Sequence, residues 1–140
     1  MDSSTDPILT PIGHVESPLE DPETAPKQGD EGAPDAWLVL NRSFAAGLDG
    51  LAVGDELLVL TWLDRASRDV LAVHPRGDLA RPLQGVFATR SPARPNPIGL
   101  HRVEIAAIEG ARLRVRNLEA LNGTPLLDLK PVLAADADER

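Results

Sequence analysis

The chain contains no cysteine and no tyrosine, and aromatic residues make up only 3% of its 140 residues. The lack of cysteine excludes disulfides, thiolate metal sites and a cysteine nucleophile. With so few aromatic rings, the core must consist of Leu, Val, Ile and Ala, and the sequence is 42% hydrophobic. This length and composition favour one compact domain with a single core.

The sequence also lacks a long hydrophobic run, and its acidic, proline-containing start leads us to expect no secretory signal. Its longest apolar stretch, residues 57–63 with Thr61 inside it, is far shorter than the roughly 20 residues that a membrane span needs. We therefore expect a cytoplasmic protein with no membrane contact. His14, His74 and His101 have no metal-ligand spacing, so we predict isolated surface or strand histidines and no metal.

Basic residues are scarce and unevenly placed. The net charge of −8 argues against a general nucleic-acid binder, because phosphate contacts need clustered Lys or Arg. Residues 1–64 carry 13 acids and 2 bases, whereas residues 65–116 carry 10 arginines and 4 acids. The middle of the chain is therefore basic enough to hold an RNA backbone locally.

Short strand patterns dominate what is present. Residues 37–40 and 56–62 are apolar runs, and the second is rich enough in Leu and Val to be buried on both faces. Alternating residues on both sides of the turn Glu109-Gly110 predict a hairpin, in which Arg112, Arg114 and Arg116 line one solvated face.

Strands at such spacing, with Gly and Pro in the turns, are typical of small barrels and sandwiches. We predict an all-β protein, a small single-domain β-barrel with long loops and little helix beyond a short turn near residues 43–48. The domain should span residues 8–133, with disordered tails at 1–7 and 134–140. Residues 18–35 have the composition of a long loop.

The most distinctive segment is residues 85–100, which read GVFATRSPARPNPIGL. Its three prolines fix φ and hold the preceding residues extended, so the segment is stiff before any ligand binds. We expect a ligand-facing turn between a strand-like entry at 86–89 and a strand at 100–108, with Arg90 and Arg94 as planar donors. The alternative is a surface crossing whose arginines are only solvated.

This segment, with LNGTPLLDLKP at residues 121–131, closely resembles the signature of the TrmO/TsaA-like family. The resemblance runs from about Ile8 to Leu133. Members of this family use S-adenosylmethionine to methylate N6-threonylcarbamoyladenosine beside the anticodon of certain tRNAs. The resemblance implies a β-barrel that pairs into a homodimer, S-adenosylmethionine as cofactor, and tRNA as partner.

Matched position by position, the resemblance implies cofactor contacts in the N-terminal loop, after the second apolar run and around both motifs. They are Pro26, Lys27, Gln28, Asp64, Arg65, Arg90, Leu100, Leu118, Glu119, Asn122, Gly123 and Thr124. We assign Arg94 and Asn96 to substrate binding, and Asp64 and Glu119 are the candidates if a general base is used.

Several of these positions depart from the family pattern. Lys27 keeps the charge of an arginine but loses its bidentate fork. Asp64 stands where many members have histidine, Glu119 replaces aspartate, and Asn122 replaces an acid that could accept from a ribose hydroxyl.

These departures leave two alternatives to a tRNA methyltransferase open. The chain could be a methyltransferase acting on a small molecule or another RNA. It could also be a barrel that binds the cofactor without catalysis.

Overall fold

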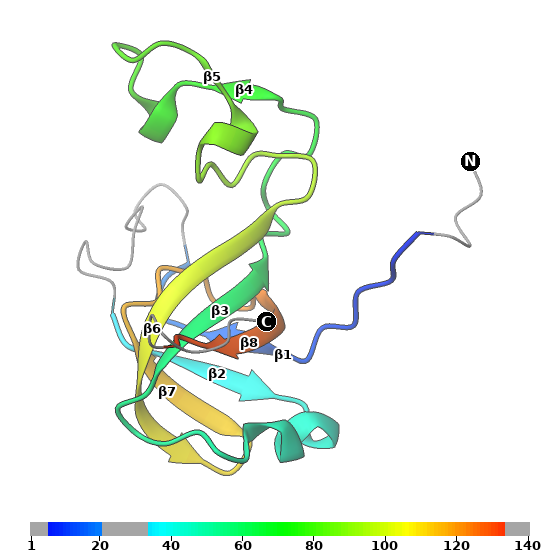
Figure 1. The fold of residues 1–140 in the computed structure, drawn as a ribbon, viewed down its shortest axis with the longest axis vertical. Coiled ribbons are helices and arrows are strands. Elements are labelled where there is room, and N and C mark those ends of the chain that lie inside the picture. Colours follow the sequence, from blue (N-terminus) through cyan, green and yellow to red (C-terminus); the bar gives the residue numbers. More distant parts are fainter. Residues whose placement is uncertain (1–5, 21–33, 134–140) are drawn as a thin grey trace.

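Six antiparallel strands form a closed barrel in the computed structural model, which describes residues 6–20 and 34–133 (Figure 1). Around the barrel the strand order is β1-β2-β7-β6-β3-β8, and a two-stranded sheet of β4 and β5 lies outside it. The elements are β1 (Gly13–Glu16), β2 (Ala36–Leu40), η3 (Arg42–Leu48), β3 (Glu56–Trp62), β4 (Ala72–Val73), η4 (Pro75–Gly77), β5 (Gln84–Gly85), η5 (Val86–Ala88), β6 (Ile98–Glu109), β7 (Arg112–Arg116) and β8 (Pro125–Pro131).

The barrel closes through a short contact between its first and last strands. β1 pairs with β8 only at Gly13 with Leu126 and at His14 with Pro125. By contrast, β3 pairs with β6 along its whole length, from Glu56 opposite Glu104 to Trp62 opposite Ile98. The all-β fold predicted from the sequence is confirmed.

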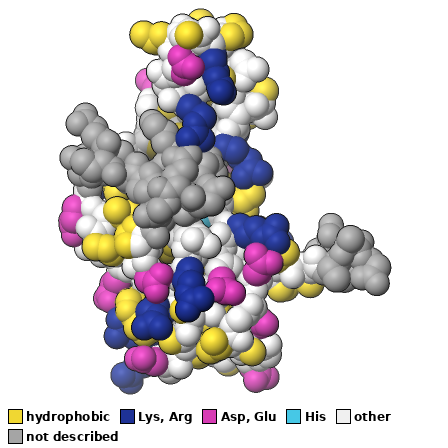
Figure 2. Space-filling model, turned by 90° about the vertical axis from the view of Figure 1, so that its left-hand side faces the viewer, with side chains coloured by type: hydrophobic (Ala, Val, Ile, Leu, Met, Phe, Trp, Pro, Cys, Tyr) yellow, Lys and Arg dark blue, Asp and Glu magenta, His cyan; other side chains and the backbone are white. Residues whose placement is uncertain are grey.

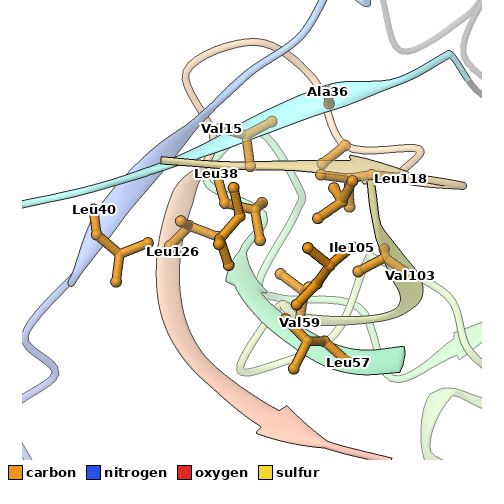
Figure 3. Close-up of a cluster of buried hydrophobic side chains, with 13 residues drawn as sticks. Val15, Ala36, Leu38, Leu40, Leu57, Val59, Val103, Ile105, Leu118 and Leu126 are labelled. Carbon is orange, nitrogen blue, oxygen red and sulfur yellow. The ribbon is translucent and has the colours of Figure 1, made fainter. Parts of the chain in front are cut away.

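The core fills the inside of the barrel (Figure 3). Alternate residues of each strand point inward, as the period of two along a strand requires. On β3, for example, Leu57 and Val59 are 1% and 0% exposed, whereas Leu58 and Leu60 on the outer face are half-buried. The expectation that this run is buried on both faces is therefore wrong, because the described residues cover the outer face of β3 less fully than the core covers its inner face.

The outer face of β6 and β7 is charged and paired. The predicted hairpin is confirmed, with Glu109 opposite Arg112 at its turn. Its arginines are exposed or half-buried on the outside and each meets a carboxylate. The ion pairs of this face are Arg102–Glu56 at 2.9 Å, Arg112–Glu16 at 3.0 Å, Arg114–Asp35 at 3.8 Å and Arg116–Glu104 at 2.9 Å.

One of these pairs joins β3 to β6 by two hydrogen bonds. The Arg102 guanidinium donates from Nε and from a terminal nitrogen to the two oxygens of Glu56. This bidentate bond holds the pKa of the Glu56 carboxyl below its usual value. Both groups are solvent-exposed, so the pair fixes the strand register more than it adds stability.

Residues 63–97 form an insert that leaves the barrel at the end of β3 and returns at the start of β6 (Figure 1). Because Trp62 and Ile98 are paired, the two ends of the insert lie side by side. Leu63 N also donates to Pro97 O at 2.8 Å, which closes the base of the insert. The short sheet of β4 and β5 is its main regular structure.

One part of the insert and the C-terminal strand differ from the sequence prediction. Residues 86–88 form a 3-10 turn, not a strand entry, because the amide and hydroxyl of Thr89 both donate to Val86 O. From the sequence we identify residues 121–131 as a motif and predict no strand there, whereas Pro125–Pro131 forms β8. The short helix near residues 43–48 is confirmed as η3.

In the two described ranges, no helix is long and apolar enough to cross a membrane. Most of the two predicted tails lies outside those ranges, as does most of the predicted loop at 18–35.

Candidate functional site

The loop between β7 and β8, residues 117–124, covers the end of the barrel from which the insert emerges. Leu118 is fully buried and belongs to the barrel core, which anchors the loop. The Thr124 hydroxyl donates to Leu121 O at 2.7 Å, and Gly123 has φ of 84°, a backbone conformation that favours glycine. The predicted residues of this loop are therefore held in one rigid turn.

A buried polar chain lies beneath this loop. Thr61 of β3, His101 of β6 and Glu119 of the loop are joined by two hydrogen bonds. The Thr61 hydroxyl oxygen lies 2.7 Å from His101 Nε2, and His101 Nδ1 lies 2.5 Å from Glu119 Oε1. The side chains of His101 and Glu119 are 5% and 16% exposed. The prediction of an isolated histidine at this position is wrong, because the hairpin of β6 and β7 brings residues 18 positions apart into contact.

The site extends to the segment that follows β1. Asn122 Oδ1 accepts from Ser17 N at 3.1 Å, and Asn122 N donates to Leu19 O at 2.7 Å. The side-chain nitrogen Nδ2 of Asn122 lies 3.4 Å from a carboxylate oxygen of Glu20. The Arg65 guanidinium donates to the backbone carbonyl oxygen of Glu20 at 3.0 Å. Asn122 and Arg65, both predicted site residues, are thus brought together through Glu20.

The proline-rich turn is tied together by the arginine that we assigned to the substrate. Arg94 donates from one terminal nitrogen to Thr89 O and Ser91 O, at 3.1 and 2.9 Å. Its other terminal nitrogen donates to Val86 O at 3.0 Å. The guanidinium therefore donates to backbone carbonyl oxygens of the turn, as amide groups do in regular secondary structure.

A second arginine fastens the same turn to the barrel. Arg68 donates to Pro95 O at 2.8 Å and to Asn96 Oδ1 at 3.3 Å. Its guanidinium lies 5.1 Å from the ring centroid of Trp62, a cation–π distance. The assigned substrate residue Asn96 is therefore held in place by Arg68.

The side chains of three of the exposed residues that we predicted to contact the cofactor, Asp64, Arg90 and Leu100, take no part in the hydrogen bonds described above. Asp64 and Arg90 are exposed, and neither side chain makes a hydrogen bond or ion pair with the described part of the chain. Leu100 is 43% exposed on the outer side of β6. Pro26, Lys27 and Gln28 lie outside the described residues. Among the described residues, no hydrogen bond or ion pair links Arg90 to Glu119 or Asn122.

Two open hollows of similar size lie on the barrel. One, of about 550 Å³, is lined by Asn122 and Gly123 together with β1 and β2 residues that include Trp37. The other, of about 540 Å³, lies under η3 and is lined by Phe44, Leu48 and other largely apolar residues. Only the first includes predicted site residues. Among the described residues, no group of three or more His, Asp or Glu side chains could hold a metal ion.

The sequence family described as the tRNA-methyltransferase O N-terminal domain matches residues 14–138. The chain belongs to this family. In structure it is similar to the solved TrmO of Pseudomonas aeruginosa, with a TM-score of 0.72 and 29% identity, covering 96% of this chain and 62% of that one. A second solved TrmO gives a TM-score of 0.74 and 30% identity, covering 96% and 64%. The chain thus spans less than two thirds of these TrmO structures.

Curated relatives are nearer in sequence. An S-adenosyl-L-methionine-binding protein of Archaeoglobus fulgidus is 46% identical over 123 residues, 88% of this chain and 87% of that protein. A probable S-adenosyl-L-methionine-binding protein of Halobacterium salinarum is 44% identical over 126 residues, which cover 89% of this chain and 97% of that protein. These names describe what the relatives bind.

The sequence analysis missed Thr61 and His101 as parts of the site. A usable signal was present, because His101 and Val103 share the inward face of the predicted strand at 100–108. A histidine on an inward face needs a buried hydrogen-bond partner. Glu20 and Arg68 carry no comparable pattern in the sequence.

The role of Arg94 leads to a testable difference between two neighbouring arginines. In Arg94→Ala the turn loses three hydrogen bonds, so the amides of Thr89, Ser91 and Ala93 should exchange with deuterium about tenfold faster or more. In Arg90→Ala, which removes an exposed side chain, exchange at these amides should not change. Hydrogen exchange measured by NMR or mass spectrometry distinguishes them, and equal exchange in both variants would refute the structural role of Arg94.

Proposed function

We propose that this protein is an S-adenosylmethionine-dependent methyltransferase that acts on N6 of threonylcarbamoyladenosine in tRNA. The observation that carries the proposal is the rigid 117–124 loop, with a carboxylate at Glu119 and an Asn-Gly turn, on the barrel of the TrmO family. The names of the relatives in Archaeoglobus fulgidus and Halobacterium salinarum support the choice of cofactor.

The described residues fit the chemistry of this cofactor. Glu119 offers a carboxylate to the ribose hydroxyls or to the positive sulfonium, and the loop around Gly123 offers backbone groups. The Arg90 guanidinium, which has no hydrogen-bond or ion-pair partner among the described residues, would offer charged donors to the methionine carboxylate in a cleft shared by the proline-rich turn and the 117–124 loop. Lys27, if it lies where the family resemblance implies, would add a second cation.

When bound, S-adenosylmethionine supplies a methyl group activated by its sulfonium. The chain's own residues need mainly to hold the two reactants in line and to exclude water, since positioning alone can be worth roughly 7 to 11 kcal/mol in model systems. Asp64, exposed beside the base of the insert, and Glu119 are the carboxylates available to take a proton from the N6 nitrogen.

The distribution of positive charge supports RNA as the substrate. On the barrel, acids neutralise the arginines of β6 and β7, as Figure 2 shows where magenta side chains adjoin blue ones. The insert, residues 63–97, contains six arginines and only three aspartates. Three of these arginines donate their hydrogen bonds to uncharged carbonyl and amide oxygens, so their positive charge is not neutralised by these bonds: Arg65, Arg68 and Arg94. The insert therefore keeps a positive surface for a phosphate backbone.

A transfer assay tests the proposed function. The purified protein, labelled S-adenosylmethionine and tRNA from a strain lacking the enzyme should yield N6-methylated threonylcarbamoyladenosine. Glu119→Gln should weaken cofactor binding about tenfold in calorimetry, because a charged acceptor is lost, whereas Glu109→Gln at the distal hairpin turn should not.

The assay also separates the alternatives. Cofactor binding without transfer to tRNA would exclude the tRNA substrate and favour another acceptor or a non-catalytic binding protein. No cofactor binding by the wild-type chain would exclude the enzyme altogether.

We propose further that the protein is a homodimer, as the family resemblance implies, and that the insert contributes to the interface. Four large apolar side chains of the insert are exposed, from Leu71 just before β4 to Phe87 within η5: Leu71 at 66%, Leu79 at 80%, Leu83 at 62% and Phe87 at 79%. Figure 2 shows hydrophobic side chains at the tip of the insert. An exposed apolar group of this kind marks an interaction surface, and a second copy of the chain would bury it.

Charge introduced on this surface should break the dimer. Leu79→Glu and Phe87→Glu should each raise the dimer dissociation constant about tenfold or more in sedimentation or light-scattering measurements, because a carboxylate would be buried without a partner. Val53→Glu is the matched control, since Val53 is 62% exposed before β3, at the other end of the barrel. A wild-type monomer, or equal effects of all three variants, would contradict this interface.

A further inference from the structure

We propose that His101 is a positioning residue, which holds the Glu119 carboxylate in one orientation toward the cofactor site through its Nδ1–H group. This inference rests on the proposed function for the identity of the ligand. Its geometric basis is the buried chain from Thr61 through His101 to Glu119, in which His101 contacts a residue of β3 and a residue of the 117–124 loop.

The hydrogen-bonded side chains of Thr61 and His101 are buried inside the barrel. The His101 ring is 5% exposed and the Thr61 side chain is fully buried. Gly99, opposite Thr61 on β6, leaves the space they need: a Cβ at position 99 would lie 2.7 Å from His101 Nε2. Because buried polar groups are costly without partners, a histidine is retained on this inward face only if both ring nitrogens are satisfied.

The hydrogen-bond chemistry fixes where the proton lies. A carboxylate can only accept, so Nδ1 must donate to an ionised Glu119. If the imidazole is neutral, Nε2 then accepts from the Thr61 hydroxyl. If the imidazole is charged, Nε2 donates to the same oxygen. In both states the Nδ1–H···Oε1 bond is kept, so Thr61 and His101 orient the carboxylate whichever charge the ring carries.

The consequence for function concerns Glu119. The loop that carries it is anchored by buried Leu118, but the flexible side chain of Glu119 is still 16% exposed. A hydrogen bond from a fixed ring removes much of that freedom before a ligand arrives, which lowers the cost of binding. Among the described residues the hydrogen bonds of this carboxylate engage only Oε1. Oε2 is then the oxygen that would meet the cofactor.

The first test uses the protein without a ligand. In ¹⁵N NMR of histidine side chains, His101 should carry a proton on Nδ1, with its signal identified by its loss in His101→Asn. Glu119→Gln should shift this Nδ1 proton upfield, since the charge-assisted bond becomes a neutral one. A His101 ring whose only proton is on Nε2 would overturn the inference.

The second test compares two replacements of the histidine. Asn at position 101 keeps a donor near the place of Nδ1, whereas Leu fills the core without a donor. In calorimetry with S-adenosylmethionine, His101→Leu should bind about tenfold more weakly than wild type, and His101→Asn should recover most of that loss. A merely structural histidine would give the opposite order, because Leu suits a buried site better than Asn.

The outcomes separate this inference from the proposed function. If wild type binds the cofactor and His101→Leu binds as well as His101→Asn or better, the positioning role is refuted and the function stands. If wild type does not bind the cofactor, the proposed function fails, and the NMR result alone decides whether His101 holds Glu119. If His101→Leu does not fold, the same NMR measurement on the wild-type protein decides.

Discussion

The pairing of β3 with β6 is the constraint on which the site depends. It runs without a break from Glu56 to Trp62, and Trp62 lies opposite Ile98. Because the two strands end together, the chain between them must leave and return at one point, and the whole insert stands over one end of the barrel. The same register puts Thr61 opposite Gly99 and next to His101, so one set of backbone hydrogen bonds places both the insert and the buried polar chain.

The two parts of the molecule use arginine in different ways. On the barrel, arginines of β6 and β7 pair with acids of neighbouring strands, where each exposed pair helps to fix the register and neutralises the charge locally. In the insert, Arg94 replaces the regular structure that a Pro-rich segment cannot form, because it donates to three carbonyl oxygens. A chain with a net charge of −8 thereby keeps a local positive surface beside the candidate site.

Much of the fold was predictable, because alternating residues and turn glycines are local signals. The hairpin of β6 and β7 follows from its period of two and from the turn at Gly110. The 3-10 turn at η5 was not predictable in this way. Val86 and Phe87 have strand propensity, but the 3-10 turn depends on Thr89 and Arg94 capturing one carbonyl oxygen, a contact that no pattern encodes.

The site was predictable only in part for a similar reason. The family resemblance leads to Glu119, Asn122 and their neighbours, since these lie within continuous motifs. The partners that hold them, His101 and Glu20, come from other strands or loops and are fixed by packing in three dimensions. The side chain of Asn122 lies beside the carboxylate of Glu20, in the segment after β1. An acid at position 122 would be repelled by this carboxylate, which explains why an amide suits this position.

The central claim is that the barrel end beneath the insert binds S-adenosylmethionine. The most direct measurement is an amide NMR titration of the wild-type protein with this cofactor. The account predicts that the largest shifts fall on residues 117–124 and on the base of the insert near Leu63 and Gly99, with little change at the opposite end of the barrel. Shifts concentrated around Phe44 and Leu48, in the hollow under η3, would contradict it.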